Sequence, residues 1–502
     1  MTDGMNGDKA DNAFSLKEFL LNLLRYTRAN PAPFFTFLVI LIDPFGLSQS
    51  TDTQSKHTSY RITAASYPDT SRDQITTILI DDVSVTKGST AFDWPPKFYQ
   101  YEDLLRAITT YDPAAIFLDI VFLDERGSSG DLKRFGKYLS SKTQGKNPIP
   151  IYAMGGQTIH FKGDRCEIEE LQILPDIANS VTNLPYFRYS GFGEDYPLYI
   201  QCDDQVLLSP AAMIMQEICA ENSRLQIDCA LPRQAELRKN IKWIDDFPPT
   251  MSVRWGDGTT DFNWATYYGS PGNKTPCIRD NEGFWSRIKH ISATLLDAFS
   301  GQFEFSLPSK CYYHSYVSAA KLVNWFDTAL RSEDISARTD RDQKLRQLIE
   351  NRVVMVGMDL AAVKDTVVSP VQGTLPGVTN HAMALDNLLT LGNKVQRPPP
   401  DFLLAASWAD VIEFLPLLVL FFLQYRLDSR VSLGPDTQFG NFITVSLATL
   451  IVTVGAMYLT AFILNWTPLN WLGLIGIWLT FVAFHYSRTR LANGLRSDTD
   501  AA

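Results

Sequence analysis

Residues 75–82 read ITTILIDD, and residues 115–122 read AIFLDIVF. Both runs are rich in β-branched and aromatic residues, which is typical of strands that are buried on both faces. Between them, residues 101–110 have the apolar spacing of a helix. The order strand, helix, strand predicts a βαβ unit and therefore an α/β domain with a largely parallel sheet.

Further elements extend this domain toward the end of the chain. Residues 149–154 and 352–357 read as strands, residues 340–351 as a polar helix, and residues 380–391 as a helix that ends at Gly392. The segment between, residues 157–334, is rich in aromatic, glycine and proline residues and predicts a large elaboration. It contains all the cysteines of the chain: Cys166, Cys202, Cys219, Cys229, Cys277 and Cys311.

The composition excludes one class of partner. The 502 residues carry a net charge of −10, whereas a nucleic-acid-binding surface needs clustered Lys and Arg side chains. Charged residues make up 20% of the chain, but long apolar runs occupy its last hundred residues. This distribution indicates a water-soluble domain that is attached to a membrane, without nucleic acid as a partner.

Apolar runs predict four transmembrane helices. Residues 402–424, 442–466 and 468–486 are each near the length of about 20 residues that spans a bilayer, and a weaker run covers residues 31–47. A signal peptide within residues 1–50 is the alternative for the weaker run. The predicted organisation is therefore a cytoplasmic segment with an amphipathic helix (1–30), an anchor (31–49), an outer domain (50–400), a three-helix transmembrane bundle (401–486) and a short cytoplasmic tail (487–502).

Basic residues flank the predicted spans on one side only, at residues 17–28, 426–430 and 488–496. Since Lys and Arg favour the cytoplasmic side, both termini are predicted inside and residues 50–400 outside. The cysteines all fall in that outer segment, which fits disulfide formation in an oxidising compartment, although six unpaired thiols are the alternative. The predicted location is the inner membrane of a bacterium, with the large domain in the periplasm.

Two acidic residues fall within the second predicted span. Asp410 and Glu413 are three residues apart and so lie on one helical face. Because ionisable groups are costly inside a bilayer, this face is expected to point toward other helices and to have a function. The alternative is that both side chains lie close enough to the outer interface to be hydrated.

Two blocks of the outer domain resemble the CHASE2 family. The first block comprises ILIDDVS (78–84), WP (94–95) and AAIFLDIVF (114–122); the second comprises RVVMVG (352–357), KD (364–365), SP (369–370), LPGV (375–378), HA (381–382) and DNLL (386–389). The resemblance implies an extracytoplasmic sensory module of bacterial signalling proteins, in which a kinase, cyclase or diguanylate-type domain usually follows the third helix. Here residues 487–502 follow it, so a separate partner polypeptide is expected.

Carboxylates follow the predicted strands. In parallel sheets ligands bind beyond the carboxyl ends of strands, which is where Asp81, Asp82, Asp119, Asp359 and Asp365 are expected. Clustered carboxylates suit a divalent cation or a cationic ligand. The alternative is that these side chains cap helices or accept hydrogen bonds from loop amides. His381 is expected near the start of a helix beside this rim.

The catalytic signatures HExxH and GxSxG and the phosphate-loop pattern are missing from the sequence. The leading hypothesis is therefore a receptor without enzymatic activity or a cofactor, which signals through a partner protein and is compatible with a homo-oligomer. A structural component of the envelope is the second hypothesis. An extracytoplasmic hydrolase that uses paired carboxylates is the third.

Overall fold

The computed structural model of the chain contains two compact units, which are described separately. The sheet domain comprises His57–Pro398 and Asn465–Thr467, and the second unit comprises Met1–Lys56, Pro399–Leu464 and Pro468–Ala502. The structure describes the following residues: 47–85, 92–155, 157–162, 165–170, 172–186, 195–202, 205–219, 246–257, 285, 288–289, 291–295, 312–331, 335–363, 365–403, 406–408, 412, 422, 435–471 and 473.

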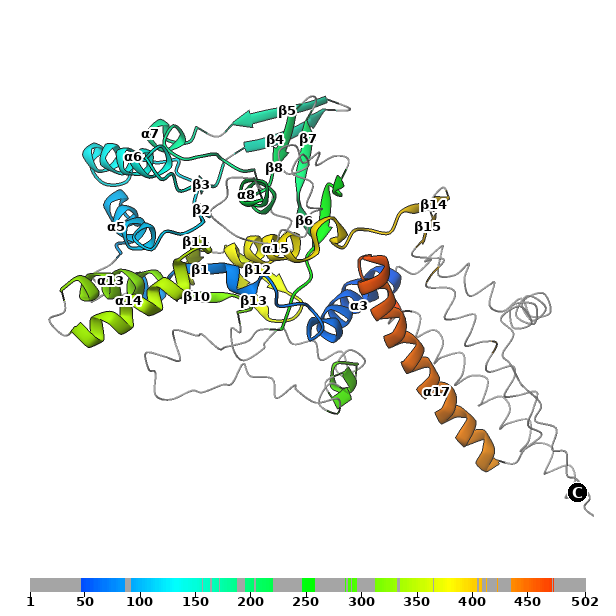
Figure 1. Cartoon of the computed structure of the whole chain (residues 1–502). Helices are drawn as coiled ribbons and strands as arrows, with labels where there is room; N and C mark the ends of the chain where they lie inside the picture. Colours follow the sequence, from blue (N-terminus) through cyan, green and yellow to red (C-terminus); the bar gives the residue numbers. More distant parts are fainter. Residues whose placement is uncertain are drawn as a thin grey trace, which may run out of the picture. The chain divides into compact units, whose positions relative to one another are not determined.

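A five-stranded parallel sheet forms the centre of the sheet domain (Figure 1). Every neighbouring pair of strands is parallel, as the sequence predicts. The carboxyl ends of the strands therefore meet at one edge, where a ligand site was expected. In spatial order, the strands are β10 (Ser315–Ser318), β1 (Ile75–Asp81), β11 (Val353–Asp359), β2 (Ala115–Leu118) and β3 (Ile151–Ala153).

The strand β11 lies between β1 and β2. The elements of the predicted βαβ unit are confirmed, with helix α5 at Phe98–Thr109, but the two strands are not neighbours because both pair with β11. The connection through α5 places β1 and β2 two strand positions apart. The position between them is occupied by β11, whose residues are mostly apolar and mostly buried. The second strand is also shorter than predicted: it ends at Leu118, so the expected strand residues 119–122 lie beyond it.

Helices cover both faces of the sheet, which is why its strands are apolar throughout (Figure 1). Within β1, Ile75 and Leu79 contribute to one hydrophobic core, whereas Ile78 and Ile80 contribute to the other. The second of these cores includes residues of α5, α6 (Ser129–Thr143), α13 (Ala319–Arg331) and α14 (Ile335–Ile349). The first includes residues of α8 (Pro210–Ile218) and α15 (Val378–Leu391).

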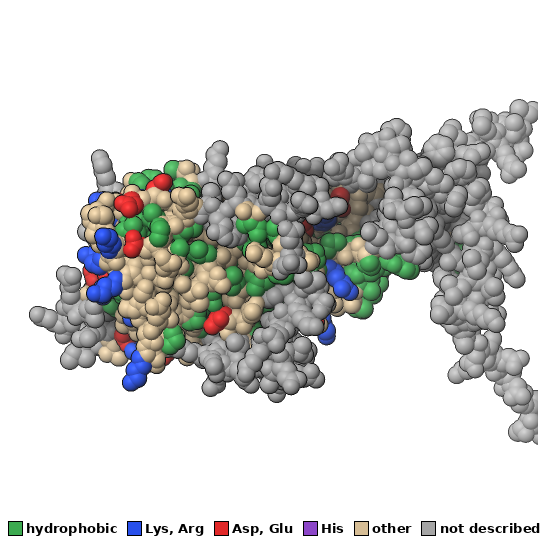
Figure 2. Space-filling model, turned by 90° about the horizontal axis from the view of Figure 1, so that it is seen from above, with side chains coloured by type: hydrophobic (Ala, Val, Ile, Leu, Met, Phe, Trp, Pro, Cys, Tyr) green, Lys and Arg blue, Asp and Glu red, His purple; other side chains and the backbone are tan. Residues whose placement is uncertain are grey.

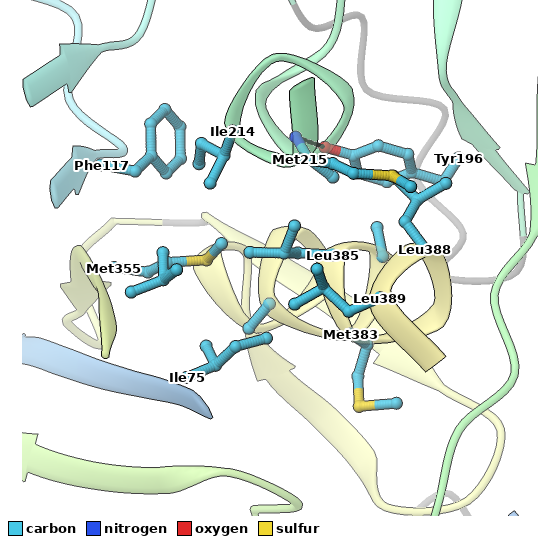
Figure 3. Close-up of a cluster of buried hydrophobic side chains, with 14 of the residues drawn as sticks. Ile75, Phe117, Tyr196, Ile214, Met215, Met355, Met383, Leu385, Leu388 and Leu389 are labelled. Carbon is cyan, nitrogen blue, oxygen red and sulfur yellow. Dashed lines mark hydrogen bonds between the residues drawn. The ribbon is translucent and has the colours of Figure 1, made fainter. Parts of the chain in front are cut away.

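Helix α15 lies between the sheet and α8. Figure 3 shows Leu385 of α15 beside Met355 of the sheet, and Leu388 of the same helix beside Met215 of α8. The predicted end of α15 is confirmed, because Gly392 follows it with a φ of +59° and donates its N–H to the carbonyl of Leu388. Two sides of α15 are thus covered, which explains why residues 378–389 are all buried.

The described residues of the middle segment do not support a separate cysteine-containing insertion. Its residues Tyr196, Ala211 and Met251 belong to the same hydrophobic core as the sheet, and residues 315–331 supply β10 and α13. The antiparallel pairs of the sheet domain are β4 (Gln157–Lys162) with β5 (Arg165–Glu170), β6 (Asp195–Pro197) with β9 (Thr250–Ser252), β7 (Tyr199–Cys202) with β8 (Gln205–Leu208), and β12 (Thr366–Ser369) with β13 (Gly373–Pro376).

Five further helices occur between residues 47 and 394 of the described chain. Helix α3 (Leu47–Ala64) precedes the sheet, and the others are η1 (Arg72–Gln74), α4 (Asp82–Val85), α7 (Pro175–Ala178) and η2 (Gly392–Lys394). On the surface, Lys and Arg side chains lie intermixed with Asp and Glu side chains at one end of the described part (Figure 2). Glu102 of α5, by contrast, is buried and pairs with the exposed Arg106 and Arg134.

The second unit contains helix α17 (Pro435–Tyr458), which continues as the π-helix η3 (Leu459–Leu464). Within the described residues, one stretch, 447–464, is long and apolar enough to cross a membrane, with a mean hydropathy of 2.2 over 18 residues. It coincides with the predicted span 442–466. Helices in the cores of soluble proteins have the same length and composition, so this stretch alone does not establish a membrane protein.

Four transmembrane helices are therefore not supported as a set. The start of the predicted span 402–424 is wrong, because β14 (Asp401–Leu403) and β15 (Ala406–Ser407) form an antiparallel pair there. Such a pair leaves edge N–H and C=O groups that lipid cannot satisfy. Residues 31–46 of the first predicted span and most of 468–486 lie outside the described residues, as do Asp410 and Glu413.

Candidate functional site

One oxygen of the carboxylate at the end of β1 is engaged in local structure. Asp81 Oδ1 accepts hydrogen bonds from the Ser84 backbone N–H at 2.9 Å, from the Ser84 hydroxyl at 2.6 Å and from the Ser318 hydroxyl at 2.9 Å. These bonds hold the turn into α4 and join it to β10. Asp81 therefore fits the alternative interpretation, in which the carboxylate stabilises a turn instead of binding a ligand.

Two other predicted rim residues also have structural contacts. Asp82 Oδ1 accepts a hydrogen bond from the backbone N–H of Ala361 at 3.3 Å, which connects the segments that follow β1 and β11. Asp359, at the end of β11, accepts a hydrogen bond from the hydroxyl of Tyr312 at 3.4 Å. Neither contact involves Asp119 or Asp365.

Asp119 and Asp365 form the electrostatically unusual pair of the rim. Asp119 follows β2 directly, and its backbone N–H donates to the carbonyl of Val356 at 2.8 Å. Its side chain is 10% exposed. Burial raises the pKa of Asp119 well above its usual range, and the negative charge of Asp365 raises it further. Burial likewise raises the pKa of Asp365. A cation or a proton at this pair would relieve the unfavourable interaction.

Two glycines allow this arrangement. A Cβ atom at Gly377 would overlap the Asp365 carboxylate, and a Cβ atom at Gly357 would lie 2.5 Å from the Cβ of Val378. The backbone N–H of Gly377 donates to the carbonyl of Asp365 at 2.9 Å. The segment before β12 therefore packs directly against the start of α15, and this places Asp365 close to the end of β2.

His381 connects α15 with this pair. Its Nδ1 lies 2.8 Å from the hydroxyl oxygen of Tyr196, which also accepts the N–H of Ala211 at 3.2 Å. Its Nε2 lies 3.7 Å from Asp119 Oδ1. Burial lowers the pKa of His381 to about 3, so the folded protein keeps the imidazole neutral at ordinary pH. In the neutral imidazole one ring nitrogen donates and the other accepts, so Tyr196 and Asp119 face nitrogens of opposite hydrogen-bonding character.

The arrangement suits binding better than catalysis. Within the described ranges, no group of three or more His, Cys, Asp or Glu side chains is placed to hold a metal ion, so the predicted divalent-cation site gains no support. Asp119 and His381 are both largely buried, which leaves little room for a substrate between them. The pair can exchange a proton or pair with a small cationic group.

A second buried polar cluster was not predicted. Asp386 of α15 is fully buried and accepts hydrogen bonds from the Tyr67 hydroxyl at 2.5 Å and from Thr390 at 3.3 Å, and it lies 3.1 Å from His314 Nε2. Its neighbour Asn387 exchanges hydrogen bonds at 2.9 Å with the backbone N–H and carbonyl of Arg254. A signal was present in the sequence, since Asp386 and Asn387 interrupt the apolar second half of the helix. Their partners are far away along the chain.

The predicted disulfide residues are partly described. Cys202 ends β7 and Cys219 follows α8, and both are buried. Cys166 lies in β5. Cys229, Cys277 and Cys311 lie outside the described residues.

The geometry so far defines a class of protein: an α/β domain with a parallel sheet whose carboxyl-terminal edge carries buried titratable groups. The chain belongs to the CHASE2 family, because the CHASE2 domain matches residues 34–424. No match to the chain was found among curated proteins, and none was found among solved structures. CHASE2 domains are extracellular sensory domains that typically occur in membrane proteins.

Proposed function

We propose that the chain is a bacterial membrane-anchored sensor whose sheet domain lies outside the cytoplasm and signals to a separate partner protein. The observation that carries the proposal is the CHASE2 match over residues 34–424, followed along the chain by the apolar stretch 447–464. The family is sensory and extracellular, and a membrane helix is what such a domain needs to pass a signal inward.

The proposed topology has four crossings of the inner membrane, at residues 31–47, within 408–424, at 442–466 and at 468–486. The second crossing begins after β15, because β14 (Asp401–Leu403) and β15 (Ala406–Ser407) are strands. Basic flanks at residues 17–28, 426–430 and 488–496 place both termini inside. The cysteines are then all on the oxidising side, where we expect them to be paired in disulfides.

The sensing residues that we propose are Asp119 and Asp365, with His381 as their neighbour. Their raised pKa values mean that a bound cationic group would release unfavourable free energy, and a conformational change could follow from it. Asp81 is excluded from this role because its carboxylate is engaged by Ser84 and Ser318. Hydrolysis by paired carboxylates is disfavoured because the pair is largely buried.

The topology is tested by reporter fusions to the full chain. Fusions of alkaline phosphatase, which is active only outside the cytoplasm, after residues 126 and 342 should be active, and fusions after residues 29 and 430 should be inactive. Active phosphatase at residue 29, or inactive phosphatase at residue 126, would contradict the proposed orientation.

The signalling role is tested by purification from native membranes. The full chain should bring down a second membrane-associated polypeptide, and the D119N variant should alter the amount recovered because it changes the sensing pair. Recovery of the chain alone, with wild type and variant alike, would contradict signalling through a partner. Recovery of envelope-assembly proteins without a signalling enzyme would favour the structural alternative.

A further inference from the structure

The amino-terminal edge of the parallel sheet, opposite the carboxylate rim, carries a polar hollow. It lies where η1 leads into β1 and where α14 leads into β11, and it is open to solvent with a volume of about 460 Å³. This volume is within the range of small-molecule sites, which is about 300 to 1,000 Å³. Among the residues that line it are Asp73, Gln74, Arg346, Glu350 and Arg352. All of them belong to the sheet domain.

Arg352 contributes a guanidinium group that is not engaged. No hydrogen bond or ion pair from its side chain is found among the described residues, and its Nη1 atom is buried without a partner. Burial lowers the pKa of Arg352, while the negative charge of Asp73 acts in the opposite direction. An anionic ligand would offset the cost of this burial, and the planar fork of a guanidinium matches a carboxylate.

Arg346 shows the contrast within the same hollow. It lies 3.1 Å from Asp342 and 3.7 Å from Glu350, and its guanidinium lies 5.8 Å from the centre of the Tyr111 ring. Its charge is therefore already balanced within the protein. Of the two arginines, Arg352 is the one whose charge is available for a ligand.

Gln74 adds an unengaged amide beside this arginine. Its Oε1 atom is buried without a hydrogen-bond partner, although its backbone N–H is fixed by a bond to the carbonyl of Ser71 at 3.0 Å. A rotation about the terminal torsion of the side chain can turn the amide toward the hollow, where its oxygen would accept a hydrogen bond. A ligand that carries an N–H donor near its anionic group would satisfy both side chains.

The charges around the hollow select between ligand classes. Asp73 and Glu350 balance Arg346 and Arg352, so the lining is neutral overall. The Asp73 side chain is 73% exposed and has a contact of 3.7 Å with its neighbour Arg72. A simple anion would meet repulsion from the two carboxylates, whereas a zwitterion would find a partner for each of its charges.

We propose that this hollow binds a free α-amino acid, with the ligand carboxylate on Arg352 and the ligand ammonium group facing Asp73 and Gln74. The inference goes beyond the proposed function, because it adds a second ligand site to the sensing pair Asp119 and Asp365, and it rests on that function only for the claim that binding is sensed. The Asp119–Asp365 pair lies at the opposite edge of the sheet and takes no part.

Calorimetric titration of the full chain in lipid nanodiscs with single L-amino acids tests the proposal. At least one amino acid should give saturable heat, and Arg352→Met should weaken its binding by at least about tenfold through loss of the charged fork. Gln74→Leu should weaken it less. The matched control is Arg134→Met, which removes an exposed arginine of α6 outside the hollow and should leave the affinity unchanged.

Thermal unfolding of each variant checks that it is folded. Arg352→Lys is a second control, because it keeps the positive charge but lacks the planar fork of the guanidinium. Absence of saturable heat for every amino acid at millimolar concentration would overturn the proposal, and so would unchanged binding to a folded Arg352→Met variant. Acetate that binds as tightly as the amino acid would exclude a zwitterion site. The reporter fusions test the sensor function separately. If they give the opposite orientation while an amino acid still binds, the binding site stands and the proposed sensor function does not.

Discussion

The hydroxyl of Tyr196 and Nδ1 of His381 lie 2.8 Å apart, although 185 residues separate them along the chain. This buried hydrogen bond joins β6 to α15, and it orients the imidazole so that Nε2 faces Asp119. The bond is therefore the link between the middle segment of the chain and the carboxylate pair at the end of the sheet.

Removal of the Tyr196 hydroxyl should destabilise the sheet domain. In Tyr196→Phe, the N–H of Ala211 and Nδ1 of His381 both lose a buried partner, which should lower the free energy of unfolding by about 1–3 kcal/mol. Urea unfolding of the full chain in detergent measures this. The matched control is Tyr99→Phe, since Tyr99 is only half-buried; an equal loss in both variants would contradict the assigned role.

The raised pKa of Asp119 predicts a stability that falls as pH rises. A carboxyl whose pKa is higher in the folded state binds more protons there than in the unfolded state, so folding is favoured below the unfolded pKa and weakened as pH rises through the folded pKa. Asp119→Asn should remove part of this decrease and be more stable than the wild type at neutral pH. Thermal unfolding as a function of pH measures both effects.

The matched control for that variant is Asp131→Asn. The pKa of Asp131 is lowered, chiefly by its hydrogen bonds with Ser128 at the start of α6, so its linkage to pH has the opposite sign. Its replacement should remove a small stabilisation that is present above the usual Asp pKa. Identical pH profiles for the two variants would contradict a raised pKa of Asp119 in the folded protein.

His381 should make the protein sensitive to acid. Its pKa is lowered from 6.5 to about 3 by burial, so the unfolded state takes up the proton first and stability is lost as pH falls below 6.5. The slope of this loss is at most about 1.4 kcal/mol per pH unit. His381→Phe keeps the ring packing against Phe117 and should flatten the acid limb.

The same variant should be less stable than the wild type at neutral pH, because the Tyr196 hydroxyl loses its hydrogen-bond partner on His381. Unfolding by urea between pH 7 and pH 4 separates the two effects. An acid limb of unchanged slope would mean that another group is responsible for it.

Gly392 should resist substitution. Its φ of +59° is in the region that favours glycine, and its N–H closes the last turn of α15. Gly392→Ala should therefore cost about 1–3 kcal/mol of stability. Gly130→Ala in the first turn of α6 is the control; it lacks a positive φ, and a Cβ atom there finds ordinary contact at 3.6 Å, so a gain of about 0.5–1 kcal/mol is expected. Equal effects of both substitutions would exclude backbone strain.

The strands that could be predicted from the sequence were those with long β-branched or aromatic runs. β1, β2 and β11 were recognised because burial on both faces requires such residues, and the shorter β3 was also recognised, within the predicted strand 149–154. β10 was missed, since its residues SYVS are few and half polar. The order of the strands could not be predicted either. It depends on the fact that β1 and β2 are not neighbours and that β11, far along the chain, pairs with both of them.

The candidate site was only partly predictable for a related reason. The position of Asp119 after a strand is visible in the sequence, but its proximity to Asp365 depends on the close packing of Gly357 and Gly377. In the sequence, Asp81 has the same position after a strand as Asp119. In the structure its carboxylate accepts a hydrogen bond from Ser318, which is 237 residues away along the chain. Tyr196 lies in a segment without a recognisable pattern, so its bond to His381 could not be expected.

The central place of β11 has a consequence for biosynthesis. β1 and β2 leave the ribosome well before Val353–Asp359, and until that segment arrives each of them has an empty neighbouring position. The two halves of the sheet can join only after more than two thirds of the chain has been made. A truncation before β11 should therefore leave an aggregation-prone fragment with unpaired strand edges, instead of a smaller stable domain.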